Sequence, residues 1–114
     1  MRRPEDTVLL RDMLDCARTA VAAVAGKTRT DLSNDAVLTA ALERFIEVIG
    51  EAASKVSAST RGELASVPWH EIIGMRNRLV HGYASVDLDV VWAVVTKDLP
   101  GLVADLDAAL EGFG

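Results

Sequence analysis

The densest group of chemically active side chains in this sequence lies between residues 76 and 83. Arg76, Asn77, Arg78, His81 and Tyr83 bring two cations, an amide, an imidazole and a phenol into this short stretch. It holds one of the two histidines and the only tyrosine of the chain. A guanidinium can grip a phosphate through two parallel hydrogen bonds, and an imidazole can move a proton near neutral pH. We therefore take these residues as the candidate active site.

An arginine and a histidine without apparent metal ligands form a suitable set for RNA cleavage. His81 would remove the proton of a ribose 2′-hydroxyl or protonate the leaving oxygen. Arg76 would stabilise the pentacoordinate phosphorane, and since no water need attack first, the product would be a cyclic phosphate. The competing interpretation is a plain helix end, in which the arginines pair with Glu71 or with acids of the last helices and the histidine is a satisfied cap.

The sequence predicts that this stretch closes a helix beginning near residue 68, with Gly82 as its left-handed cap. Asn77 and His81, four residues apart, would then share a face, so that the amide could fix the tautomer of the imidazole. Arg76 and His81, five residues apart, would point about 140° away from each other. Either the helix loosens near Gly82 or a second copy of the chain completes the site. This geometry favours a homodimer.

Apolar residues at helical spacing predict two long helices in the first half of the chain. One begins at Pro4 and ends near Gly26, and residues 26–34 are expected to form a loop. Ser33 or Asn34 is expected to cap the second helix. Gly50 lies in the middle of that helix, where glycine is unfavourable, and this predicts a close crossing by another helix.

The second half of the chain predicts a break at residues 59–62, the helix that carries the motif, and a helix that begins at Asp87. Residues 99–101 are expected to kink or restart this last helix, and Asp98 and Pro100 favour a restart. Short links between the helices favour antiparallel neighbours. The sequence therefore predicts a single all-α domain over residues 1–114, an up-and-down bundle of four or five helices.

Composition and cysteine usage suggest a soluble cytoplasmic protein. The single Cys16 excludes an internal disulfide and a cysteine-based zinc cluster. Acidic residues near the N-terminus argue against a secretory signal, and no window approaches the roughly 18 apolar residues of a membrane span. Glu43, Glu47 and Glu51 form a ladder that could hold a metal, but no histidine stands at a matching spacing. We expect no metal, no cofactor and no membrane contact.

The net charge of −5 is distributed unevenly along the chain. Residues 82–114 carry one base and six acids, so the acidity is mostly a property of the C-terminal helices. A polyanion would bind near Arg76 and Arg78, with modest and salt-sensitive affinity. Arg78 is two residues from Arg76 and points elsewhere, so it is expected to make either a secondary RNA contact or an ion pair.

Three segments together carry a family resemblance: residues 49–53 (IGEAA), 68–83 (PWHEIIGMRNRLVHGY) and 87–92 (DLDVVW). They resemble the HepT family of HEPN-domain toxins, and the similarity runs through nearly the whole chain. The family motif is an arginine, a polar residue, three further residues, a histidine, any residue and a tyrosine. Arg76, Asn77, His81 and Tyr83 match this motif position by position.

The resemblance implies an all-α HEPN bundle, a homodimer with a shared cleft, and metal-independent endoribonuclease activity that is toxic when unopposed. It gives Arg76 and His81 the catalytic roles. Family antitoxins are MNT-type minimal nucleotidyltransferases, which can transfer AMP to the motif tyrosine, here Tyr83. The added negative charge beside Arg76 would exclude the RNA phosphate.

Two other functions compete with the nuclease. One is a catalytically silent HEPN module that binds and positions a nucleotidyltransferase partner. Such a module would be free to lose Arg76 or His81, and this chain has both. The other is a plain helical dimerisation domain, which leaves the motif unexplained.

Overall fold

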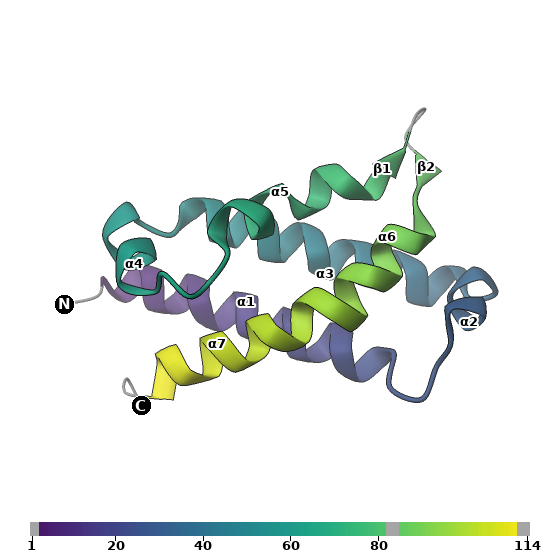
Figure 1. Cartoon of the computed structure of the whole chain (residues 1–114), viewed down its shortest axis with the longest axis horizontal. Helices are drawn as coiled ribbons and strands as arrows, with labels where there is room; N and C mark the ends of the chain where they lie inside the picture. The colour runs from purple at the N-terminus through teal and green to yellow at the C-terminus, as the bar shows by residue number, and fades with distance from the viewer. Residues whose placement is uncertain (1–2, 82–84, 112–114) are drawn as a thin grey trace.

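The protein is a bundle whose long helices run alternately up and down (Figure 1). The computed structural model describes residues 3–81 and 85–111. In chain order its elements are α1 (Pro4–Ala23), α2 (Arg29–Ser33), α3 (Ala36–Lys55), α4 (Ala58–Glu63), α5 (Trp69–Leu79), β1 (Val80–His81), β2 (Ser85–Val86), α6 (Leu88–Ala93), the π-helix η1 (Val94–Asp98) and α7 (Leu99–Glu111). The predicted all-α class is confirmed, and the described residues add one small two-stranded ladder.

The core is built around α1, which packs against both α3 and α7. The buried residues of α1 recur at helical spacing and present one apolar face: Leu10, Met13, Leu14, Ala17 and Ala20. The helix α3 packs its own buried face against them: Leu42, Ile46, Ile49, Ala52 and Ala53. None of the described helices is long and apolar enough to cross a membrane.

The predicted close crossing at Gly50 is confirmed, and the crossing partner is α5. A Cβ at Gly50 would meet the carbonyl oxygens of Ile72 and Ile73 at 3.4 and 3.5 Å. The absence of a side chain lets the backbone of α5 lie directly on α3. This contact determines how closely α5, the helix that carries the arginines of the candidate site, packs against α3.

Enlarging Gly50 is expected to destabilise the protein in steps. Gly50→Ala should stay within about 1 kcal/mol of wild type, because its Cβ reaches ordinary contact distance and alanine favours the helix. Gly50→Val should lose about 2 kcal/mol, because α5 must move away. Urea unfolding followed by circular dichroism measures both. Gly101→Val is the control, since a Cβ there meets nothing within 4 Å; an equal loss at both positions would contradict the close-crossing explanation.

The segment 26–34, predicted as a loop, contains the short helix α2. It forms because Thr28 and Asp31 make a capping box, in which each side chain accepts the backbone N–H of the other residue. Ser33 is therefore already helical, and the cap of α3 is Asp35 instead of Ser33 or Asn34. The Asp35 carboxylate accepts a hydrogen bond from a backbone N–H of the first turn of α3 at 2.9 Å.

The predicted break at residues 59–62 likewise forms a short helix, α4, whose N-cap is Ser57. Beneath this cap lies the carboxylate of Asp6 from the first turn of α1, with only 2% of its surface exposed. It accepts hydrogen bonds from the Ser57 N–H at 3.0 Å and from the hydroxyls of Ser57 and Thr60, both at 2.6 Å. The start of α1 is thus fastened to the turn between α3 and α4.

The predicted restart at Pro100 is wrong, because the chain passes from α6 to α7 as one rod through the π-helix η1. A proline inside a regular helix clashes with the carbonyl four residues earlier, and the wider turn just before Pro100 relieves this conflict. The π-helix also corrects the register of the buried stripe. From Val91 to Leu110 the chain advances 19 residues (110 − 91), whereas five regular turns need about 18. One extra residue in the π-helix keeps the buried positions on one face.

Candidate active site

Arg76, Asn77 and Arg78 lie on the last turn of α5, and all three are exposed. The opposite side of the helix buries Ile72, Met75 and Leu79 at spacings of three and four residues. Because this apolar side faces the core, the three polar side chains must face outward. The sequence prediction places them correctly at the end of this helix.

The two arginines differ in their partners. A terminal guanidinium nitrogen of Arg78 lies 3.6 Å from an Oδ of Asp98, the last residue of η1. Of the two expectations for Arg78, the structure supports the ion pair with an acid of the last helices. Among the residues that the structure describes, none forms a hydrogen bond or ion pair with Arg76. None of the described residues therefore compensates the charge of Arg76.

The helix ends earlier than predicted, at Leu79 instead of Gly82. The Leu79 carbonyl accepts the backbone N–H of Asp87 at 2.7 Å, and the backbone of β1 pairs in antiparallel fashion with β2, His81 opposite Ser85. The expectation that Asn77 and His81 share a helix face is therefore wrong.

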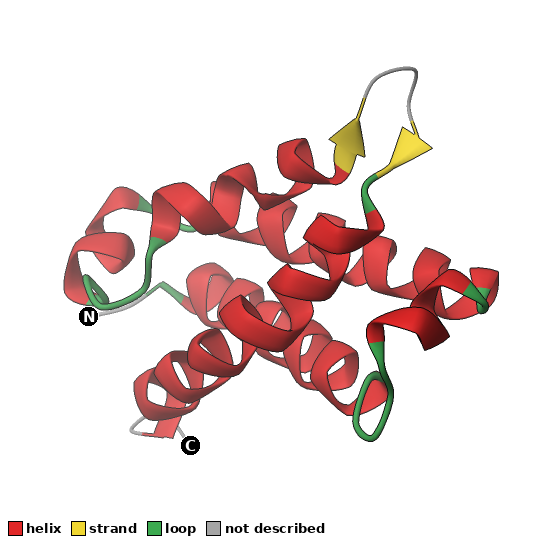
Figure 2. Cartoon of the chain, turned by 45° about the vertical axis from the view of Figure 1, so that its right-hand side comes forward, coloured by secondary structure: helices red, strands yellow, loops and turns green. Residues whose placement is uncertain are grey.

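The early helix end changes what the motif can do. Arg76 belongs to the helix and the backbone of His81 to a strand, so the 140° separation expected on one regular helix no longer applies. The strands β1 and β2 lie at the edge of the bundle, beyond the end of α5 (Figure 2). The side chain of His81, and Gly82 and Tyr83 altogether, lie outside the described residues.

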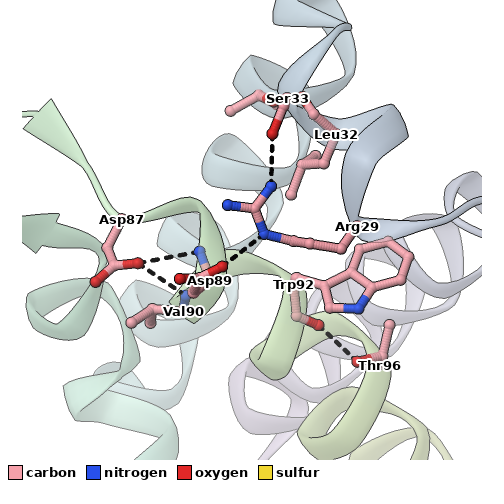
Figure 3. Close-up of polar contacts among 9 residues, drawn as sticks. Arg29, Leu32, Ser33, Asp87, Asp89, Val90, Trp92 and Thr96 are labelled. Atoms are coloured by element: carbon pink, nitrogen blue, oxygen red, sulfur yellow. Dashed lines mark hydrogen bonds and ion pairs between the residues drawn. The ribbon is translucent and has the colours of Figure 1, made fainter.

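The chain leaving the hairpin is held by α2 (Figure 3). Asp87 caps α6 and accepts the N–H groups of Asp89 and Val90 at 3.0 and 3.2 Å. Arg29 of α2 donates to Asp89 at 2.7 Å and to the hydroxyl of Ser33, also at 2.7 Å. The strand β2 therefore leads into the N-terminus of α6, which is held to α2 by the contact between Arg29 and Asp89.

Several titratable side chains outside the motif have structural explanations. Glu47 pairs with Arg44 at 3.8 Å, and Glu51 pairs with Lys55 at 3.5 Å, so two members of the glutamate ladder form surface ion pairs. Burial, and then the charge of Glu47, raises the pKa of Glu43. Burial also raises the pKa of the half-buried Cys16 thiol, with Asp12 and Asp15 adding to the effect. A thiol with a raised pKa is a poor nucleophile.

The two clearest hollows that the described residues line lie away from the motif. The larger, of about 460 Å³, lies between α1 and α7 and is lined by Arg11, Leu14, Arg18, Asp107, Leu110 and Glu111. The smaller lies between α1 and α3. The residues of the candidate site line neither of them, and the arginines at the end of α5 stand on open surface. An open surface suits an extended polymer better than an enclosed small molecule.

Comparison with known proteins places this chain in a family. The family model described as "Ribonuclease HepT-like" matches residues 13–109. The chain is 36% identical over 88 residues to "Putative RNase TTE0752" of Caldanaerobacter subterraneus subsp. tengcongensis, covering 77% of this chain and 79% of that protein. It is 27% identical over 107 residues to "Putative RNase MJ1380" of Methanocaldococcus jannaschii, covering 94% and 98%.

A shorter match carries the family name itself. The chain is 37% identical over 62 residues to "Probable ribonuclease HepT" of Thermococcus cleftensis, which covers 54% of this chain and 56% of that protein. No solved structure matches the chain significantly. The family model spans 97 residues (109 − 13 + 1), from α1 to α7, and includes the helix and hairpin of the motif. The resemblance seen in the sequence is confirmed, and this chain belongs to the HepT-like ribonuclease family.

Proposed function

We propose that this chain is a metal-independent endoribonuclease and the toxin of a HEPN/MNT toxin–antitoxin pair. The observation that carries the proposal is the state of Arg76. It is exposed on the last turn of α5, just before the strand that holds His81, and none of the described residues compensates its charge. Membership of the HepT-like family and the RNase names of its relatives support the same activity.

The proposed reaction needs only groups of the chain and of RNA. His81 takes the proton of a ribose 2′-hydroxyl, and the 2′-oxygen attacks the neighbouring phosphorus. The bond from phosphorus to the 5′-oxygen breaks, and that oxygen leaves with a proton from a general acid. Arg76 binds the non-bridging oxygens of the phosphorane, where negative charge gathers. The products are a 2′,3′-cyclic phosphate and a 5′-hydroxyl end.

The need for a general acid in addition to the general base is the reason to propose a homodimer. One chain supplies a single motif histidine, whereas this reaction has one proton to remove and one to deliver. A two-fold arrangement of two motif hairpins would supply two imidazoles and two Arg76 guanidinium groups to one cleft. Asn77, exposed beside Arg76, would orient RNA or the imidazole from the rim of this cleft.

We further propose that an MNT-type nucleotidyltransferase antitoxin silences the site by transferring AMP to Tyr83. The phosphate would add negative charge next to Arg76 and occupy the position of the RNA phosphate. Intact mass spectrometry after co-expression with such an enzyme tests this step. An adduct on wild type that disappears in Tyr83→Phe supports it, and an unmodified wild type in the presence of an active enzyme counts against it.

The activity itself is tested by incubating purified wild type with tRNA and mRNA in EDTA and mapping the ends. We expect cyclic phosphate and 5′-hydroxyl ends. Sedimentation at micromolar concentration should show a dimer, and a pure monomer would rule out the shared cleft. A chain that neither cuts RNA nor accepts AMP would instead fit the silent module that positions a nucleotidyltransferase.

A further inference from the structure

We infer that Asp98 is a positioning residue of the proposed cleavage site, acting through Arg78 on the orientation of Arg76. The inference rests on the proposed function for the role of Arg76. It goes beyond it because Asp98 lies outside the motif, 20 residues beyond Arg78 in the sequence (98 − 78). It also replaces the RNA-binding role that was one of the two expectations for Arg78.

The ion pair adds a restraint on the rotation of the last turn of α5, beyond the packing of its buried face. Arg76 and Arg78 are two residues apart, which is about 200° around a helix, so their side chains leave on opposite sides. On one side of α5, a terminal guanidinium nitrogen of Arg78 lies 3.6 Å from an Oδ of Asp98. A rotation of the helix end that broke this pair would swing Arg76 by the same angle.

The same pair closes the loop that carries the motif. Residues 79–97 contain the hairpin, α6 and most of η1, and the Arg78–Asp98 pair joins the two ends of this segment. A second contact lies within this segment, where the Asp87 N–H donates a hydrogen bond to the Leu79 carbonyl at 2.7 Å. The two contacts together define how α5 meets the hairpin that leads from Arg76 to His81.

The π-helix is what brings Asp98 to this position. A π-helical turn holds about one more residue than an α-helical turn, and each residue added to a helix rotates the later part of that helix by about 100°. Asp98 is the last residue of η1 and stands half exposed, beside the buried Leu99. Without the extra residue, Asp98 would be rotated away relative to Val91 and the rest of α6.

Charge gives the pair a second effect on the site. Asp98 compensates Arg78, whereas no residue in the described part of the chain compensates Arg76. If Arg78 were freed, the two guanidinium groups on opposite sides of the helix would offer RNA two alternative phosphate contacts. RNA would then bind in unproductive registers, which lowers the rate of cleavage without weakening binding.

The experiment measures kcat and KM for RNA cleavage by wild type, Asp98→Ala and the charge swap Arg78→Asp/Asp98→Arg. Asp98→Ala should lower kcat about tenfold with KM within about twofold of wild type, and the swap should restore most of kcat. The matched control is the Arg18–Asp107 pair between α1 and α7, whose side chains are 51% and 48% exposed, against 49% and 43% for Arg78 and Asp98. Asp107→Ala and its swap should leave both constants unchanged.

Two results would overturn the inference. One is a changed KM with an unchanged kcat in Asp98→Ala, which would make Arg78 a simple RNA contact. The other is a swap that fails to restore kcat.

Hydrogen exchange at the Asp87 amide separates this inference from the proposed function, because it needs no activity. The exchange should accelerate by about fivefold or more in Asp98→Ala and stay unchanged in Asp107→Ala. If wild type does not cut RNA but the exchange accelerates, the nuclease proposal fails and the positioning of the loop stands. If wild type cuts RNA and Asp98→Ala changes neither kcat nor the exchange, the positioning role alone fails.

Discussion

Replacing Arg76 by alanine is expected to lower kcat for RNA cleavage by about 100- to 1000-fold while the fold stays intact. The loss has this size because a preorganised donor aimed at a developing charge contributes mainly in the transition state. Arg76 is exposed and has no partner among the described residues, so its removal should change the free energy of unfolding by less than about 0.5 kcal/mol. Arg76→Lys should keep part of the rate, because it retains the charge but loses the two parallel hydrogen bonds.

The control for Arg76→Ala is Arg11→Ala on α1. Arg11 is also an exposed arginine without a partner among the described residues, and it lies on the hollow between α1 and α7, away from the motif. Its removal changes the net charge equally and should leave kcat unchanged. His81→Ala should lose activity to a similar extent as Arg76→Ala, because it removes the group proposed to move the proton. Equal cutting by all the variants would mean a contaminating nuclease or a different site.

Removing the Asp6 carboxylate is expected to cost about 3 kcal/mol of the free energy of unfolding at pH 7. Asp6→Ala leaves the N–H of Ser57 and the hydroxyls of Ser57 and Thr60 without their acceptor. Hydrogen bonds to a charged group are stronger than neutral ones, and a buried donor left unpaired is costly. Urea unfolding of wild type and variant gives the difference directly.

The same contact predicts how stability depends on pH. The hydrogen bonds from the Ser57 and Thr60 side chains lower the pKa of Asp6 below its ordinary value, and they outweigh the opposite effect of burial. A carboxyl group with a lowered folded pKa contributes stability above its unfolded pKa, about 4. That contribution is lost as pH falls through the lower folded pKa. The gap between wild type and Asp6→Asn should therefore be constant near neutral pH and shrink in the acid range below about pH 4.

Asp35→Asn is the matched control for the acid titration. Asp35 also accepts a backbone N–H at a helix start, but it is exposed and makes one such bond. Its substitution should cost less than about 1 kcal/mol, because asparagine caps helices nearly as well as aspartate. A gap between wild type and Asp6→Asn that stays constant down to the lowest pH of the titration would contradict the lowered pKa of Asp6.

The long helices could be predicted from the sequence because their apolar residues repeat over several turns. Leu10, Met13, Leu14 and Ala17 define a buried face without knowledge of what covers it. Gly50 indicated a close crossing because glycine inside a long helix is otherwise unfavourable. The helices α2 and α4 could not be predicted in this way, since one turn is too short to show a period. Their formation depends on local caps and, for α4, on Asp6, which lies about 50 residues earlier in the chain.

The candidate site was located by residue type, but its geometry depends on contacts between distant segments. Periodicity alone allows α5 to continue to Gly82, whereas in the structure the Asp87 N–H bonds the Leu79 carbonyl and β1 pairs with β2, so that the helix ends at Leu79. The ion pair of Arg78 with Asp98 also needed the structure. Asp98 is one of six acids after residue 82, and no spacing rule in the sequence distinguishes it from the others.

The π-helix also has a consequence for sequence length within the family. Suppose that one residue between positions 94 and 98 were deleted and the segment became a regular α-helix. The five turns from Val91 to Leu110 would then hold the regular number of residues, so Leu102, Leu106 and Leu110 would still face α1. The same deletion inside α3 would rotate half of its buried face into solvent. Alignments of related chains should therefore accept a one-residue gap at η1 and resist one in α3. Chains that have the gap are predicted to lack the counterpart of the Arg78–Asp98 pair.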